Sequence, residues 1–270
     1  MSFFTIDKKV NIVYLINMTH PIDRRSRKRQ ERTQLILATA QTILLNEGLE
    51  AVTVHRIARE LDLTVGALYR YFPSKQAMLT ALGEDIVRSV TSSLGQIADI
   101  YEASVQDSQA ASPLTPVLVI SRAFIEMAES SPARYRMVDL MLVDPRSMVP
   151  EEDRPMVLHT LFEMLGRVEQ LLKQSTAEHL ISAGQPRERT IVLWSALLGI
   201  NSMLKMRRLY PEQVPAKNLG EDTITALFVA WGCDASVFKN HFNEATAFLE
   251  NLKTESNSSH EGDLLWRSLS

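Results

Sequence analysis

Apolar residues recur at helical spacing along this 270-residue chain, and that periodicity limits the folds open to it. Strand signals are nearly missing, because apolar and polar residues rarely alternate and no Asn-Gly hairpin turn occurs. Between residues 30 and 47, five apolar residues share one helical face: Ile36, Leu37, Ala40, Ile43 and Leu44. The sequence therefore predicts an all-α fold.

Prolines, glycines and short polar clusters divide the chain into helical segments. Gly48 follows the first segment, at a position where a positive φ often ends a helix. A long helix is expected over residues 75–105, and residues 106–116 form a loop. The other helices are expected over residues 117–129, 132–142, 155–182, 187–209, 219–231 and 236–252. About ten helices and no sheet are predicted.

The composition is that of a globular protein, with 45% apolar and 23% charged residues. The single cysteine, Cys233, excludes an internal disulfide and suits a reducing cytoplasm, which is the compartment we expect. No apolar run approaches the roughly 18 residues of a membrane span. The net charge is −3, but residues 20–82 carry +4 and residues 83–270 carry −8. Such asymmetry favours contact between the N-terminal end and a polyanion.

Two short helices joined by a tight turn are expected between Thr53 and Phe72. Thr53 and Thr64 are suited to cap the two helices, with Asp62 and Leu63 in the turn. The inner faces of the pair match each other through Ile57, Ala58, Leu61, Leu68 and Phe72. This arrangement predicts a helix-turn-helix.

The outward face of the second helix suits a DNA groove. It has small residues at its start, where the backbone can approach the groove floor, and longer polar residues further along. Arg70 can reach a guanine edge or a phosphate, and the hydroxyls of Tyr69 and Tyr71 can donate to phosphates. Taken alone, an exposed helix that simply carries tyrosines explains the pattern equally well.

The flanking residues favour DNA. Lys75 stands at the start of the next helix, after the expected cap Ser74, where its charge opposes the helix dipole. That position makes sense if Lys75 and the free amides hold a phosphate together. A basic run, residues 24–29 with Arg32 one helical step on, precedes the first expected helix as an arm that can neutralise phosphates or enter a minor groove. A solvated charge run is the alternative for this segment.

Residues from about 34 to 82 resemble the DNA-binding domain of the TetR family of repressors. The matching pieces, about a fifth of the chain, are Ala40…Glu47-Gly48, Thr53-Val54-x-x-Ile57-Ala58, Leu61-x-Leu63-Thr64-x-Gly66-Ala67-Leu68-Tyr69-x-Tyr71-Phe72 and Pro73-Ser74-Lys75-x-x-Met78-Leu79. Asp62 stands where the family often has glycine, and Thr64 where it often has serine.

The resemblance implies two sets of DNA contacts. Phosphates would be bound by Thr53, Tyr71 and Lys75, to which the charge pattern adds Arg29 and Arg32. Base edges would be read by the outward face of the second helix: Thr64, Val65, Gly66, Ala67, Tyr69 and Arg70.

The resemblance also implies that the rest of the chain forms a dimer and holds a small molecule. Residues 187–209 and 219–231 are the expected dimer helices, and plain burial in the core is the alternative reading of their apolar residues. Eight of the eleven methionines lie between Met127 and Met206, which fits a pocket for a flexible apolar ligand, although such a stripe can also be core alone. The candidate lining residues are Phe124, Met127, Tyr135, Met141, Met164 and Trp194.

Four segments follow from these patterns. Residues 1–23 are an extension that is expected to be disordered or a non-native start, with residues 1–17 as an upstream extension or misassigned start. Residues 24–82 bind DNA, 83–253 form the effector and dimerisation domain, and 254–270 are a disordered tail. No catalytic motif, cofactor motif or metal-ligand spacing stands out, so we expect neither an enzyme nor a cofactor or metal site.

The predicted function is that of a homodimeric repressor with a near-palindromic operator. Its recognition helices would enter successive major grooves about 34–36 Å apart, and a small apolar or amphipathic effector would release it. Two alternatives stay open. One is a DNA-binding regulator that activates transcription, or is controlled by a protein partner, without a small ligand. The other is a helical ligand-binding protein or enzyme with a vestigial helix-turn-helix. The sequence specifies neither operator, effector nor the sign of regulation.

Overall fold

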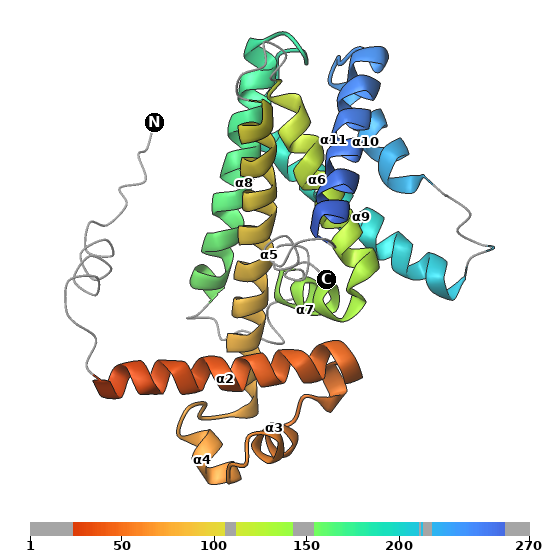
Figure 1. Ribbon diagram of the computed structural model, residues 1–270. Helices are drawn as coiled ribbons and strands as arrows, with labels where there is room; N and C mark the ends of the chain where they lie inside the picture. Colours follow the sequence, from red (N-terminus) through yellow and green to blue (C-terminus); the bar gives the residue numbers. More distant parts are fainter. Residues whose placement is uncertain (1–23, 106–111, 143–153, 211, 213–217, 257–270) are drawn as a thin grey trace.

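The computed structural model describes residues 24–105, 112–142, 154–210, 212 and 218–256. Within these ranges the chain forms ten α-helices, one short 3-10 helix and no strand. Figure 1 shows how the α-helices are arranged. The all-α prediction is therefore confirmed. The predictions for residues 1–23, for the loop at 143–153 and for nearly all of the C-terminal tail lie outside the described residues.

The N-terminal part begins with α2 (Arg24–Glu47), which lies across the lower end of the long helix α5 (Lys75–Val105) in Figure 1. The 3-10 helix η1 (Leu49–Ala51) and the short helices α3 (Val54–Glu60) and α4 (Val65–Tyr69) connect the two. The five buried residues of α2 are the five apolar residues of the predicted stripe. The amphipathic pattern therefore identified the face that packs on the rest of the unit.

The start of α2 corrects one prediction. The basic residues 24–29, expected to form an arm before the helix, are its first turns. Arginine, lysine and glutamine are good helix formers, and no proline or glycine interrupts the run. The positive charges are therefore fixed to a rigid rod and do not lie on a free arm.

The C-terminal part is a bundle built around α6 (Leu114–Ser130). This helix packs against α5, α7 (Pro132–Leu142), α8 (Arg154–Ala177), α9 (Pro186–Leu209) and α11 (Ala235–Ser256), and α10 (Leu219–Ala230) packs against α9 and α11. Six residues of α6 are completely buried: Leu114, Thr115, Val117, Leu118, Val119 and Ala123. The apolar core runs without a break from Ile36 to Leu249, so the two parts share one core.

Helix α8 ends earlier than predicted, at Ala177 and not near residue 182. His179 takes a left-handed conformation, with φ of 59°, and the amide of Leu180 donates to the Ser175 carbonyl. Glycine usually marks such a helix end, and a histidine at this position does not indicate one, so the end could not be predicted.

A single arginine fastens α8 to the C-terminal half of α5. Arg167 forms ion pairs with Asp99 at 2.6 Å and Glu102 at 3.0 Å, and it donates to the Gly95 carbonyl at 3.1 Å. The other end of α5 begins at Lys75, in the N-terminal unit. One helix thus connects the anchored bundle with the segment that carries the candidate site.

Candidate nucleic-acid interface

Three side-chain caps hold the helix-turn-helix in place. The Thr53 hydroxyl accepts a hydrogen bond from the Arg56 amide at 3.2 Å, and the Thr64 hydroxyl accepts one from the Ala67 amide at 3.1 Å. Ser74 caps α5 in the same way, accepting from the Ala77 amide at 3.0 Å. All three caps were predicted from the sequence. Since each hydroxyl acts only as an acceptor here, its proton stays available to a phosphate oxygen.

The turn between α3 and α4 contains a strained residue. Asp62 has a φ of 52°, a left-handed conformation that glycine adopts freely and that short polar side chains tolerate. The Leu63 amide donates to the Ala58 carbonyl at 2.8 Å and closes the turn. This backbone geometry gives a physical reason for the glycine that TetR-like sequences often have here.

The outward face of α4 is accessible. Leu68 and Phe72 are buried beneath it, as the sequence predicts, whereas Tyr69 is 45% exposed. Of the six proposed base-reading residues, Thr64, Gly66, Tyr69 and Arg70 are exposed, while Val65 and Ala67 are half-buried. The structure therefore brings the set to one surface, with Val65 also packed against the core.

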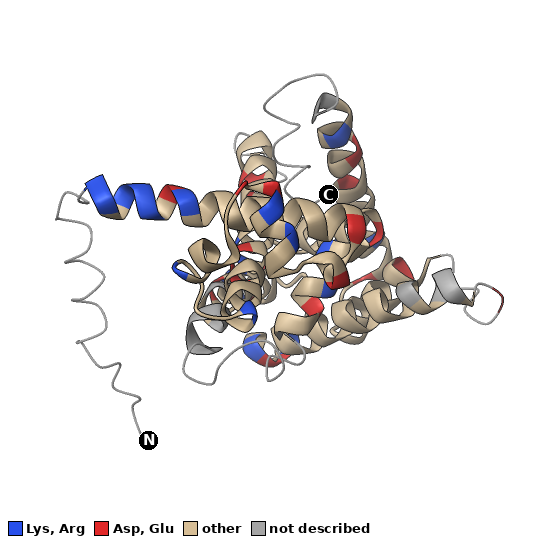
Figure 2. Ribbon diagram, turned by 90° about the horizontal axis from the view of Figure 1, so that it is seen from below, with Lys and Arg blue, Asp and Glu red and all other residues tan. Residues whose placement is uncertain are grey.

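The proposed phosphate-binding residues flank this surface. Lys75 is exposed on the first turn of α5, and Thr53 and Tyr71 are half-buried. Arg29 is exposed and donates to the Arg70 carbonyl at 3.4 Å, which ties the basic end of α2 to the end of α4. Figure 2, seen from below, shows basic residues gathered along the first turns of α2.

An ion-pair network that sequence reasoning missed stiffens α3. Arg56 contacts Glu47 of α2 at 2.9 Å and Glu60 of its own helix at 3.3 Å. The pair with Glu60 has the i, i+4 spacing that signals such contacts, but the pair with Glu47 depends on how α2 and α3 meet. Because two carboxylates engage Arg56, this guanidinium supports the fold more directly than it offers charge to DNA.

The apolar residues of the two expected dimer helices differ in their exposure. Ile224 and Phe228 of α10 are completely buried within the chain, which is the core reading left open by the sequence. On α9, by contrast, apolar side chains stay exposed at helical spacing, namely Ile191, Val192, Met203 and Met206, and Val229 of α10 is exposed as well.

The cavity that holds three of the predicted pocket residues is very small. Phe124, Met164 and Trp194 line a space of about 30 Å³ between α5, α6, α8 and α9, which is room for about one water molecule. Met127 and Met141 are buried in the core, and the sulfur side of Met141 packs onto Gly83 of α5. Tyr135 lines a different and larger pocket of about 300 Å³, beside Gly48.

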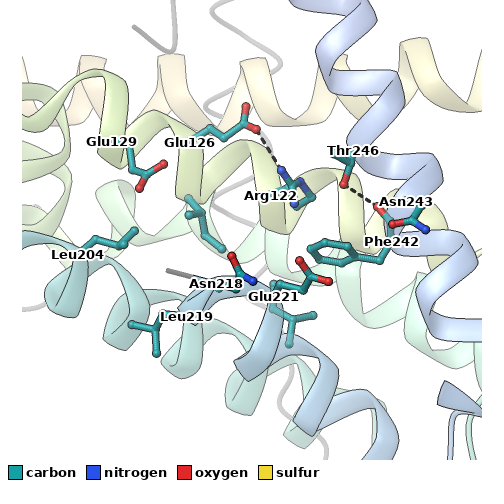
Figure 3. Close-up of a pocket in the computed structure, with 13 residues that line it drawn as sticks. Arg122, Glu126, Glu129, Leu204, Asn218, Leu219, Glu221, Phe242, Asn243 and Thr246 are labelled. Carbon is teal, nitrogen blue, oxygen red and sulfur yellow. Dashed lines mark hydrogen bonds and ion pairs between the residues drawn. The ribbon is translucent and has the colours of Figure 1, made fainter. Parts of the chain in front are cut away.

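Figure 3 shows another pocket, of about 390 Å³, between α6, α10 and α11. Its charged groups largely satisfy one another. Arg122 pairs with Glu126 at 3.5 Å and lies 4.9 Å from the ring centre of Phe242, while Lys253 contacts Glu126 at 2.6 Å. These pairs leave the buried Nε of Arg122 without a hydrogen-bond partner among the described residues.

Among the described residues, no group of histidines, cysteines and carboxylates could hold a metal ion. Within the same ranges, no helix has both the length and the apolar character to cross a membrane.

Comparisons with known proteins agree with the geometry of the N-terminal unit. Residues 36–82 match the family of bacterial regulatory proteins described as the tetR family. The nucleoid occlusion factor SlmA of Pectobacterium carotovorum is 27% identical over 163 residues, which are 60% of this chain and 74% of that protein. SlmA of Haemophilus ducreyi is 42% identical over 77 residues, which are 28% of this chain and 38% of that protein.

The solved structure of RolR in complex with resorcinol has a TM-score of 0.54 at 15% identity, covering 80% of this chain and 95% of RolR. At this identity the likeness shows a shared fold.

Proposed function

We propose that this member of the TetR family of bacterial regulatory proteins binds a near-palindromic DNA site as a homodimer and thereby controls transcription. The observation that carries the proposal is the accessible face of α4, which Lys75 and Arg29 flank with positive charge. Small exposed residues at the start of a recognition helix allow close approach to base edges. The flanking cations and hydroxyls supply the phosphate contacts that fix its register.

The exposed face of α9 supports the dimer. Ser195 and Gly199 lie among its exposed apolar residues, and a Cβ built on Gly199 meets nothing within 4 Å. Small residues within an apolar helical face let a second helix approach closely, and an exposed apolar patch on a folded chain often marks an interface. We therefore place the two-fold contact on α9, with Val229 of α10 at its edge.

Repression by occupying a promoter is the mode we propose for the dimer. A small effector would relieve it by binding more tightly to the form that does not fit DNA. The proposed domains are residues 24–82 for DNA binding and 83–253 for dimerisation and effector binding. Because α5 belongs to both, a change in the bundle has a direct mechanical route to the DNA-binding unit.

The test is binding of the full chain to fragments of its own genomic DNA across a salt series. Lys75→Ala is compared with Lys239→Ala, which removes an exposed lysine on α11. Selective binding by the wild type is expected, with the salt slope reduced by about two per dimer in Lys75→Ala, since each lost phosphate contact removes about one. Lys239→Ala should match the wild type.

Equal weak binding to all fragments, unchanged by Lys75→Ala, would overturn the proposal. It would favour a helical ligand-binding protein or enzyme whose helix-turn-helix is vestigial.

A second candidate is a DNA-binding factor that acts without a small effector. The small size of the cavity beside Phe124 favours it, as does the similarity to SlmA, which extends well beyond residues 36–82. Mapping the bound sites on the chromosome separates the two. Sites confined to one or a few promoters support the regulator, whereas many sites outside promoters support a factor that acts on the nucleoid.

A further inference from the structure

A pocket of about 300 Å³ lies where the DNA-binding unit meets the C-terminal bundle. One wall is formed by Gly48 and Leu49, which follow α2, and the others by the adjoining ends of α6 and α7 and by α9. Figure 1 shows α7 directly above one end of α2, and the two helices are in contact. The apolar lining residues are Leu49, Ala128, Pro132, Ala133 and Leu204. The pocket therefore has the apolar lining typical of small-molecule sites.

Two polar side chains in its wall are buried without well-aligned hydrogen bonds. Asn201 on α9 is 2% exposed and Tyr135 on α7 is 7% exposed. The Tyr135 hydroxyl and the Asn201 side chain lie close enough to interact with each other, but neither that hydroxyl nor the Oδ1 and Nδ2 atoms of Asn201 form a well-aligned hydrogen bond within the described part of the chain. Buried polar groups in folded proteins are almost always satisfied, so unsatisfied ones beside a pocket point to a partner that is not part of the chain.

The electrostatics of the pocket favour a neutral partner. Burial, followed by the charge of Asp139, raises the pKa of Tyr135 to about 12, while the hydrogen-bonding interaction with the Asn201 side chain lowers this pKa. The raised pKa keeps the Tyr135 hydroxyl protonated, and thus able to donate a hydrogen bond, well above neutral pH. The pocket wall also carries Asp139 and Arg136, and Arg136 lies 3.8 Å from Glu50, so a charged ligand of either sign would meet a like charge in this region.

We propose that this junction pocket binds a small neutral molecule with an apolar body and a head group that both donates and accepts hydrogen bonds, such as a carboxamide or a hydroxyl. The head group pairs with the amide of Asn201 and the hydroxyl of Tyr135, and the body lies against Leu49, Ala133 and Leu204. A carboxamide matches Asn201 particularly well, because each amide offers the donor and the acceptor that the other lacks.

The position of the pocket gives such a ligand a route to DNA binding, and this part rests on the proposed function. Gly48 has a φ of 85° and ends α2, and α3 begins only six residues later. A ligand that fills the space between Leu49 and α7 fixes how the DNA-binding unit sits on the bundle. It shifts DNA affinity only as far as it prefers one arrangement over the other.

The test uses benzamide as the probe, with toluene lacking the head group and benzoate carrying a charge. Binding to the full chain is followed by saturation-transfer NMR titration. Benzamide is expected to bind saturably and at least about tenfold more tightly than toluene or benzoate, because an unmatched buried donor or acceptor forfeits about that factor. Asn201→Leu and Tyr135→Phe should each weaken benzamide binding by about fivefold or more. Asn240→Leu, at an exposed position of α11, should leave it unchanged.

Absent or non-saturable binding of benzamide overturns the proposal, as does equal binding of toluene, or unchanged benzamide binding in both junction variants. Thermal unfolding of the same samples verifies that each variant is folded.

DNA binding is measured separately on the same preparations. If the protein binds DNA selectively but not benzamide, the pocket proposal fails while the regulator stands. If benzamide binds but DNA does not, the pocket stands and the regulator fails.

Discussion

Replacing Asn201 by leucine is expected to make the protein more stable, although the change removes a polar group from its interior. The amide of Asn201 has both polar atoms buried and neither in a well-aligned hydrogen bond, since its interaction with Tyr135 has poor geometry, and the side chain is only 2% exposed. A buried polar group without a partner costs about 1–3 kcal/mol. Leucine removes that cost, and the adjacent pocket of about 300 Å³ gives its larger side chain room without overpacking.

The net gain in the free energy of unfolding should be about 1–3 kcal/mol, since relief of the two unsatisfied atoms is only partly additive. For a chain of this size, that corresponds to an increase in Tm of about 2–10 °C. Thermal unfolding followed by circular dichroism measures it, at one fixed protein concentration because a dimer makes Tm depend on concentration. The control is Asn240→Leu, at an exposed position of α11, which should change stability by no more than about 0.5 kcal/mol.

A lower Tm for Asn201→Leu would refute this reasoning. It would mean that ordered water in the pocket already satisfies the amide and that leucine displaces it at a net cost.

Three further outcomes are expected. Asp62→Ala should be less stable than Asp62→Gly by about 1 kcal/mol in urea unfolding, because a Cβ destabilises the left-handed backbone conformation that glycine adopts freely. Equal stability of the two variants would contradict the φ of 52°. The pKa of Tyr135 is raised to about 12 in the folded chain, so its contribution to the free energy of unfolding should be fully present below pH 10 and decrease as the pH rises toward 12. The Tyr135→Phe variant should lose less stability over that interval, and identical losses would show that the hydroxyl is not buried as described. Gly199→Arg should convert a dimer to a monomer in analytical ultracentrifugation while Gly199→Ala does not, and a dimeric arginine variant would move the interface away from α9.

The parts of the structure that follow from local sequence were predicted well. The caps at Thr53, Thr64 and Ser74 each involve a hydroxyl and an amide three residues later, so the interaction lies within a few residues of sequence. The buried stripe of α2 depends on periodicity in the same way.

The parts that depend on how distant elements meet were not predicted. Periodicity places Phe228 on the apolar face of its helix, but it does not indicate whether another helix of the same chain or a second chain covers that face. In the structure the chain itself covers Phe228. No sequence pattern predicts the burial of Asn201, because the residues around it come from α7, α9 and the segment after α2. For the same reason, the junction pocket could not be predicted from the pattern of any single helix.

The Arg167 clamp on α5 gives that helix the geometry of a lever. Lys75 stands 24 residues from Asp99, which at 1.5 Å per residue is about 36 Å of rigid arm. A swing of about 5° around the clamp carries Lys75 through about 3 Å, close to the 3.4 Å between neighbouring nucleotides of a strand. In a symmetric dimer both ends would move, and because Met141 of α7 packs onto Gly83 of α5, such a swing requires the packing between α5 and α7 to shift with it.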